Sequence, residues 1–171
     1  MKPAWAELRP DPKTIDMSHC DTKLFSKYIH WLYFKTIPME RVKSPNDECF
    51  QSLAGAYILG EELMDVNFKN AITDTFLAHV SIAIPSPGMV KTIYDGTSEG
   101  SLGRRLMSDM YAYAAYADKK DAWHTAFEGC SVDFLVDILK TMTKTRDRLS
   151  MTQRPWIISE TAYHEREPNQ T

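Results

Sequence analysis

The segment Gly96–Arg105 combines glycines, hydroxyl side chains and two adjacent arginines at the start of a predicted helix. Glycines leave backbone amides accessible, and a helix N-terminus attracts negative charge, so this segment could bind a small anion or a nucleotide. It is not a Walker loop, because no Lys-Ser or Lys-Thr follows the second glycine and no buried strand precedes it. The favoured interpretation is a glycine-rich connection whose arginines pair with Glu99, Asp95 or Asp109.

Cysteine and histidine occur together at His19-Cys20-Asp21, which could meet Cys49, and again at His124 and Cys130. Nucleophilic catalysis would need a third group to orient the base, and neither place supplies one. The three cysteines also lack zinc-type spacing, and their odd number is typical of reduced intracellular thiols. We therefore predict caps or core positions here, with no catalytic residue, no metal and no cofactor.

The aromatic residues Trp31, Tyr33 and Phe34 could form a stacking platform for nucleic-acid bases. They lack an interleaved basic stripe, and the net charge of -3 gives no general attraction to phosphate backbones. Core packing is the favoured explanation, and we expect no nucleic-acid partner.

Basic residues recur four apart at Lys140, Lys144 and Arg148. Such a pattern is typical of a solvated helix face. A nuclear-import signal or a patch for an acidic partner is the sharper alternative, which the sequence leaves open.

Composition and length favour an intracellular globular domain. The chain has 171 residues, of which 43% are hydrophobic, and this is the length of one ordinary domain with tails. Charges and prolines interrupt the first twenty residues, so no signal peptide is expected. No apolar run approaches the ~20 residues that span a bilayer, so we expect no membrane partner and a cytoplasmic or nuclear location.

Hydrophobic periodicity and capping residues predict a mainly α fold with at most a small remnant sheet. Residues 1–13 are an irregular lead-in, and 14–80 form the core, with a short strand at 14–17. A helix capped by Asp21 runs to about Phe34. A second helix begins at Ser44-Pro45, and a third, capped by Asp65, turns back on it as a helical hairpin.

Residues 81–149 are predicted to be a helical extension, and 150–171 a disordered tail. Within the extension, Ser86-Pro87 begins a helix that stops at Gly96, and another runs from Leu102 to Tyr116. Residues 118–129 are less regular and are anchored by two aromatic side chains. A last helix starts at Ser131 and ends near Arg148. The anchoring side chains are Trp123 and Phe127, and the apolar residues expected to be buried in the last helix are Phe134, Leu135, Ile138, Leu139 and Met142.

Several motifs, in this order, resemble the later part of a BTB/POZ domain of the fungal type. They are Thr14-Ile-Asp-Met17, Phe25-x-x-Tyr28-x-x-Trp31-Leu-Tyr33, Leu53-x-x-Ala56-Tyr57-x-Leu59-Gly60, Phe68-Lys-Asn-Ala71, Ile93-Tyr-Asp-Gly-Thr97, Glu99-Gly-Ser101 and Arg104-Arg-Leu106. The resemblance covers about residues 14 to 110. It implies a small sheet capping a cluster of helices, and a non-catalytic role in protein–protein contact.

The resemblance also implies that two strands and a helical pair normally precede the segment that starts near Thr14. Without them, the helix 24–34 would leave apolar surface in water, so we expect self-association. The candidate contact residues are Phe25, Tyr28, Trp31, Asn46, Glu48, Arg104 and Arg105.

A cullin ubiquitin ligase is a further partner that the resemblance implies. Cullin adaptors usually carry a hydrophobic residue two positions before an acid at the helix that starts near Pro45. In this chain the position two residues before Glu48 is Asn46, which is polar. We therefore do not assign the adaptor role. Two other functions stay open: an anion-binding module that uses Gly96–Arg105, and an incomplete gene product without a separate function.

Overall fold

The computed structural model describes residues 17–18, 20–39, 48–79, 85–115 and 122–147, and within them the fold is mainly helical. This confirms the predicted fold class. The described part of the chain contains helices and no strand. The helices are α2 (Thr22–Phe34), α3 (Glu48–Glu62), α4 (Val66–His79), α5 (Pro87–Gly96), α6 (Leu102–Ala114), α7 (Ala122–Phe127) and α8 (Val132–Thr145).

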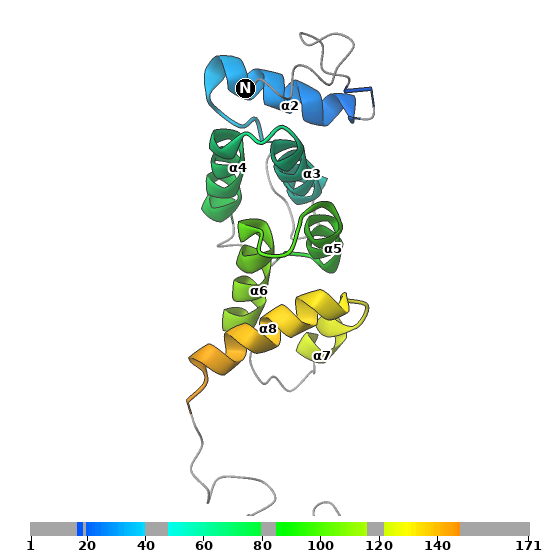
Figure 1. The fold of residues 1–171 in the computed structure, drawn as a ribbon, viewed down its shortest axis with the longest axis vertical. Helices are drawn as coiled ribbons and strands as arrows, with labels where there is room; N and C mark the ends of the chain where they lie inside the picture. Colours follow the sequence, from blue (N-terminus) through cyan, green and yellow to red (C-terminus); the bar gives the residue numbers. More distant parts are fainter. Residues whose placement is uncertain (1–16, 19, 40–47, 80–84, 116–121, 148–171) are drawn as a thin grey trace, which may run out of the picture.

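The helices form an elongated stack (Figure 1). Helix α2 lies across one end of the α3–α4 pair, α5 and α6 occupy the middle, and α7 and α8 lie at the opposite end. Helix α3 contacts α2, α4 and α5, and α6 packs against α8. Among the helices of the described ranges, α2 packs chiefly against α3.

One hydrophobic core runs through most of this stack. It joins Trp31 of α2 to Phe76 of α4, Tyr111 of α6 and Phe134 of α8, all buried in a single cluster. Edge-to-face contacts link its aromatic rings, for example Tyr111 to Phe134 with 5.0 Å between ring centroids. The segments predicted as a core at 14–80 and an extension at 81–149 therefore share one interior.

Polar caps begin four of the helices where the sequence predicts them. Asp21 accepts a hydrogen bond from the Lys23 amide at 2.7 Å, and Asp65 accepts one from the Phe68 amide at 3.0 Å. Ser86 and Ser131 act in the same way for α5 and α8. These side chains satisfy amides that have no partner inside the helix. The predicted hairpin of α3 and α4 is confirmed, with residues 63–65 as its turn.

Several sequence predictions differ from the structure. Residues 122–127 form the short helix α7, whereas an irregular segment was expected, although Trp123 and Phe127 do pack on Tyr111. Leu139 is 60% exposed because α6 covers only one side of α8. Helices α6 and α8 also end earlier than predicted, at Ala114 and Thr145.

Other predictions concern residues outside the described ranges. These are the lead-in, the strand at 14–17 apart from Met17, the helix start at Ser44-Pro45, and the tail from residue 150.

Two glycines at the second position of their helices have opposite surroundings. A β-carbon at Gly103 in α6 would lie 2.8 Å from Cε1 of the buried Tyr57 ring, whereas one at Gly88 in α5 would meet nothing nearer than 3.9 Å. Gly103 is therefore required for the close packing of α6 on α3, whereas Gly88 has room for a larger residue.

We predict that Gly103→Ala lowers the free energy of unfolding by about 1 to 3 kcal/mol, because the Tyr57 ring must move. Gly88→Ala should leave it unchanged or raise it by up to about 1 kcal/mol, because alanine favours a helix over glycine. Urea denaturation followed by circular dichroism measures both. Equal effects of the two substitutions would contradict this account of α6 packing.

Candidate interaction surface on helix α2

The inner side of α2 holds two of the predicted contact residues in structural roles. Trp31 is 6% exposed, and its ring centroid lies 5.3 Å from that of Phe68. Tyr28 is half-buried, packs edge-on against Phe68 at 4.8 Å, and donates a hydrogen bond to Asp65 at 3.1 Å. Burial, followed by the bond to Asp65, raises the pKa of Tyr28. The assignment of Trp31 to a contact surface is therefore corrected, since its side chain belongs to the core.

The outer side of α2 carries Phe25, Ile29 and Leu32, which we call the α2 stripe. Their side chains are 36%, 36% and 40% exposed. The spacing of four and then three residues places them on one flank of the helix. Phe25 is therefore on the surface, as predicted. The exposed apolar surface continues along α2 through Ile29 and Leu32.

Tyr33 and Phe34 are the last two residues of α2, and the Phe34 ring lies 4.6 Å from the ring of His30, on the flank opposite the α2 stripe. They are 79% and 66% exposed, so the expectation that they pack in the core is wrong. The helix ends at Lys35, which adopts a left-handed conformation with φ 56°. Their exposure enlarges the apolar surface at this end of the molecule.

The predicted cullin-type contact is described only in part. Glu48 is the first residue of α3 and is exposed, while Asn46 lies outside the described residues.

Arg104 is bound to the backbone of its own loop. Its guanidinium donates to the carbonyl oxygen of Tyr94 at 2.6 Å, to that of Thr97, and to the Thr97 hydroxyl at 3.2 Å. It also lies over the Tyr94 ring, 4.8 Å from the centroid. The sequence predicted pairing with a carboxylate, whereas the guanidinium donates to carbonyls at the end of α5, which have no partner inside the helix. The guanidinium of Arg104 is therefore already engaged within the protein and is not positioned to bind an anion through two parallel hydrogen bonds.

Arg105 differs from its neighbour, because its side chain is 75% exposed and pairs with Asp109 at 3.5 Å, as predicted. With Lys140 and Lys144 of α8 it lines an open groove of about 520 Å³ between α6 and α8. Carboxylates interrupt this basic lining, since Asp109 and Asp137 lie in the same groove. Each pairs with a cation there, Asp137 with Lys140 at 3.2 Å.

Asp137 has a second role that the sequence did not indicate. It accepts a hydrogen bond from the Tyr94 hydroxyl at 3.0 Å, which ties α8 to α5. Burial, and then this bond, raise the pKa of Tyr94 well above its usual range. Nearby, burial raises the pKa of Tyr111 to about 12, and its hydroxyl donates to the Pro85 carbonyl at 2.8 Å. Both phenol groups therefore stay protonated at neutral pH and act as hydrogen-bond donors within the fold.

Two of the three thiols, those of Cys20 and Cys130, lack the environment of a nucleophile. Burial raises the pKa of Cys130, and burial together with the charges of Glu62 and Asp21 raises that of Cys20. A reactive cysteine needs the opposite shift. No group of three metal-ligating side chains occurs among the described residues.

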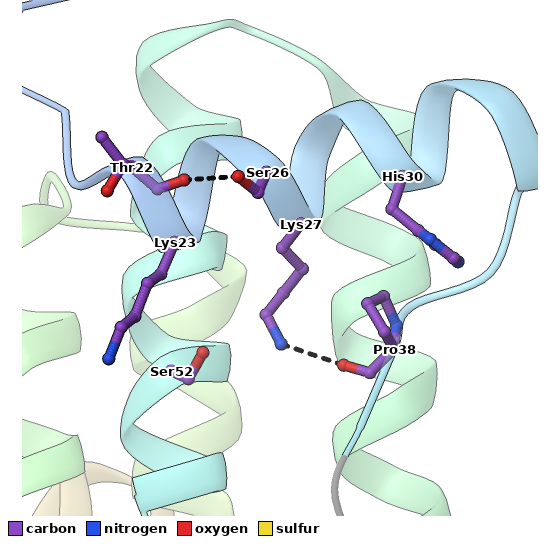
Figure 2. Close-up of a pocket in the computed structure, with 7 residues that line it drawn as sticks. All are labelled: Thr22, Lys23, Ser26, Lys27, His30, Pro38 and Ser52. Carbon is purple, nitrogen blue, oxygen red and sulfur yellow. Dashed lines mark hydrogen bonds between the residues drawn. The ribbon is translucent and has the colours of Figure 1, made fainter.

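A hollow of about 460 Å³ lies beside α2 (Figure 2). The helical spacing of its lining residues places it on another flank than the α2 stripe. Lys23, Lys27 and His30 line it from α2, and Ser52 lines it from α3. Sequence reasoning missed this site, although the helical spacing of the three basic residues was a signal for a shared face.

No protein family matches the chain, and neither a curated protein nor a solved structure matches it. Within the described ranges, no helix is long and apolar enough to cross a membrane.

The contrast between the two arginines gives a test. We predict that Arg104→Ala lowers the free energy of unfolding by about 2 to 4 kcal/mol, because it leaves partly buried carbonyls without donors. Arg105→Ala, at an exposed surface pair, should change it by less than about 0.5 kcal/mol. Chemical denaturation measures both. A stable Arg104→Ala protein that instead loses a phosphate-dependent rise in melting temperature would favour the anion-binding function.

Proposed function

We propose that this chain is a non-catalytic protein–protein interaction module related to BTB/POZ domains, and that it binds a second copy of itself through the α2 stripe. The observation that carries the proposal is the exposure of Phe25, Ile29 and Leu32 along one flank of an ordered helix. Grouped apolar side chains on a protein surface are typical of contact sites, whereas single ones are not.

The apolar part of α2 is wider than the surface that covers it. At about 100° per residue, its apolar side chains from 24 to 33 span roughly 200° of the helix circumference. Only Trp31 is buried, with Leu24 and Tyr28 half-buried beside it. A helix that faces solvent on one side usually has a polar outer flank. The remaining apolar flank of α2 therefore favours a protein partner.

A second copy is the occupant that the surface favours. Tyr33 stands next to the α2 stripe and is 79% exposed, and large aromatic side chains often carry most of the binding energy in protein interfaces. A helix flank that meets its own symmetry mate makes a closed, two-fold contact, the commonest form of assembly. The α2 stripe contains no charged side chain, so two copies of it can face each other without repulsion between like charges.

The relation to BTB/POZ domains is supported by where its motif residues lie. Trp31, from the first helical motif, packs on Phe68 from the third. Gly60, from the second, lets α4 approach, since a β-carbon there would lie 3.3 Å from Phe68 Cδ1. Motifs far apart in the sequence thus meet at one junction of α2, α3 and α4, as expected for residues that define a fold.

We predict that Ile29→Glu weakens self-association at least tenfold, because a carboxylate would be buried in the contact without a partner. The matched control is Leu77→Glu on α4, where the leucine is 48% exposed and lies outside the α2 stripe. It should leave self-association unchanged. Sedimentation equilibrium over a range of concentrations measures both variants.

Both variants should keep their helical content, since each substitution is at an exposed position. A wild-type chain that stays monomeric at high concentration and unfolds in one sharp thermal transition would contradict the proposal. Equal weakening by the two substitutions would also contradict it, because the α2 stripe would then have no special role.

A further inference from the structure

Helix α8 is apolar on two opposite faces. One face carries Phe134 and Ile138, which are buried in the core. The other carries Val132, Val136 and Leu139, which are 73%, 41% and 60% exposed and which we call the α8 stripe. At about 100° per residue, these three side chains lie within about 60° of one another and roughly opposite Phe134. The α8 stripe therefore points away from the core that holds the helix.

Packing within the described part of the chain places the α8 stripe on the outer side. Among the described helices, α6 is the main neighbour of α8. The hydrogen bonds that tie α8 to other helices, from Thr141 to Asp109 at 3.3 Å and from Tyr94 to Asp137 at 3.0 Å, lie on the core side. A helix that faces solvent on one side usually has a polar outer face. Apolar residues grouped over two turns of that face are typical of a contact site.

The sequence that follows α8 contains one run of large apolar residues. Trp156, Ile157 and Ile158 are consecutive and form the longest such run after residue 147. We call them segment 156–158, and they lie outside the described residues. Removing apolar side chains from water is favourable by about 25 cal/mol per Å², so a run of this kind in a mostly polar stretch favours a covered position.

We propose that segment 156–158 folds back onto the α8 stripe and covers it within the same molecule. Helix α8 ends at Thr145, and the α8 stripe begins six residues before that end at Leu139 and reaches back to Val132. These positions are about 9 and 20 Å from the helix end along its axis. The eleven residues from Thr145 to Trp156 can span up to about 36 Å. The chain is therefore long enough to reverse its direction and reach any part of the stripe.

The attachment to α8 favours this segment over a separate molecule. A short tether keeps a segment at a local concentration on the order of mM, which a second copy or a partner protein must exceed to displace it. Two α8 stripes facing each other would pair only valine and leucine side chains. Segment 156–158 supplies Trp156, and a tryptophan can bury about 150 to 250 Å² in such a contact.

This contact goes beyond the proposed self-association and does not depend on it. Helices α2 and α8 lie at opposite ends of the stack (Figure 1), so each surface can be altered without touching the other. Ile29→Glu in the α2 stripe should leave the contact of segment 156–158 unchanged. Loss of that contact should leave self-association through α2 unchanged.

Nuclear magnetic resonance of the full chain at low concentration tests the proposal. We expect nuclear Overhauser effects between the Trp156 ring and the methyl groups of Val136 and Leu139, with Trp156→Phe used to assign the indole signal. Val136→Glu should remove them and move the indole N–H signal to that of a solvent-exposed tryptophan, because a carboxylate would be buried without a partner. The matched control is Val66→Glu on α4, where the valine is 59% exposed, and it should leave both signals unchanged.

Limited proteolysis gives a second measurement on the same variants. Chymotrypsin cleaves after tryptophan, and cleavage follows the population of the open form when opening and closing are fast. We expect Val136→Glu to accelerate cleavage after Trp156 about tenfold, and Val66→Glu to change it by less than about twofold. Circular dichroism checks that both variants keep their helices.

Four results would overturn the proposal. The first is an indole signal of Trp156 that is already that of a solvent-exposed side chain in the wild type. The second is an equal effect of the two substitutions. The third is a contact of Trp156 with the α2 stripe in place of the α8 stripe. The fourth is an Overhauser effect that arises only between differently labelled copies, which would assign the α8 stripe to an interface between two chains.

Discussion

Close approach of neighbouring helices to α3 is the constraint on which the rest of the structure depends. At each approach one partner is a glycine whose missing side chain leaves room for the other helix. The pairs are Gly55 with Leu24 of α2, Gly60 with Lys69 of α4, Ile58 with Gly96 of α5, and Tyr57 with Gly103 of α6. Cores are packed as densely as crystals, so a single methyl group at such a place forces a neighbour to move. Helix α3 thereby sets the position of α2 and of the surfaces that α2 presents.

Within the described part of the chain, helix α2 is held on one side, and two chemically different flanks remain. Leu24, Tyr28 and Trp31 attach it to α3 and α4, and this attachment orients everything else on the helix. One free flank is apolar and uncharged, and the other is basic. A rigid helix with two chemically distinct flanks can contact two partners, or two parts of one assembly, at the same time. The fold places these contacts at one end of the stack, away from α8 (Figure 1).

Local signals in the sequence predicted much of the fold, and tertiary contacts decided the rest. The caps at Asp21, Asp65, Ser86 and Ser131 were predictable because each satisfies amides within its own first turn. The burial of Ala56, Leu59 and Gly60 was not, since a helix covered on several sides has no single apolar face. Likewise, no sequence pattern shows that Arg104 turns to the carbonyls of Tyr94 and Thr97 while Arg105 faces solvent. Of the candidate surface, Phe25 was predicted, whereas the extent of the α2 stripe and the basic hollow followed from where α3 and α4 end.

The central claim is that the apolar flank of α2 forms a protein contact, and concentration-dependent nuclear magnetic resonance tests it most directly. Methyl and aromatic signals of Phe25, Ile29 and Leu32 should shift as the concentration of the chain rises, because these side chains become buried in the contact. Signals from Val136 and Leu139 on α8, which are similarly exposed, should stay constant. Constant signals along α2, or shifts confined to α8, would contradict the claim.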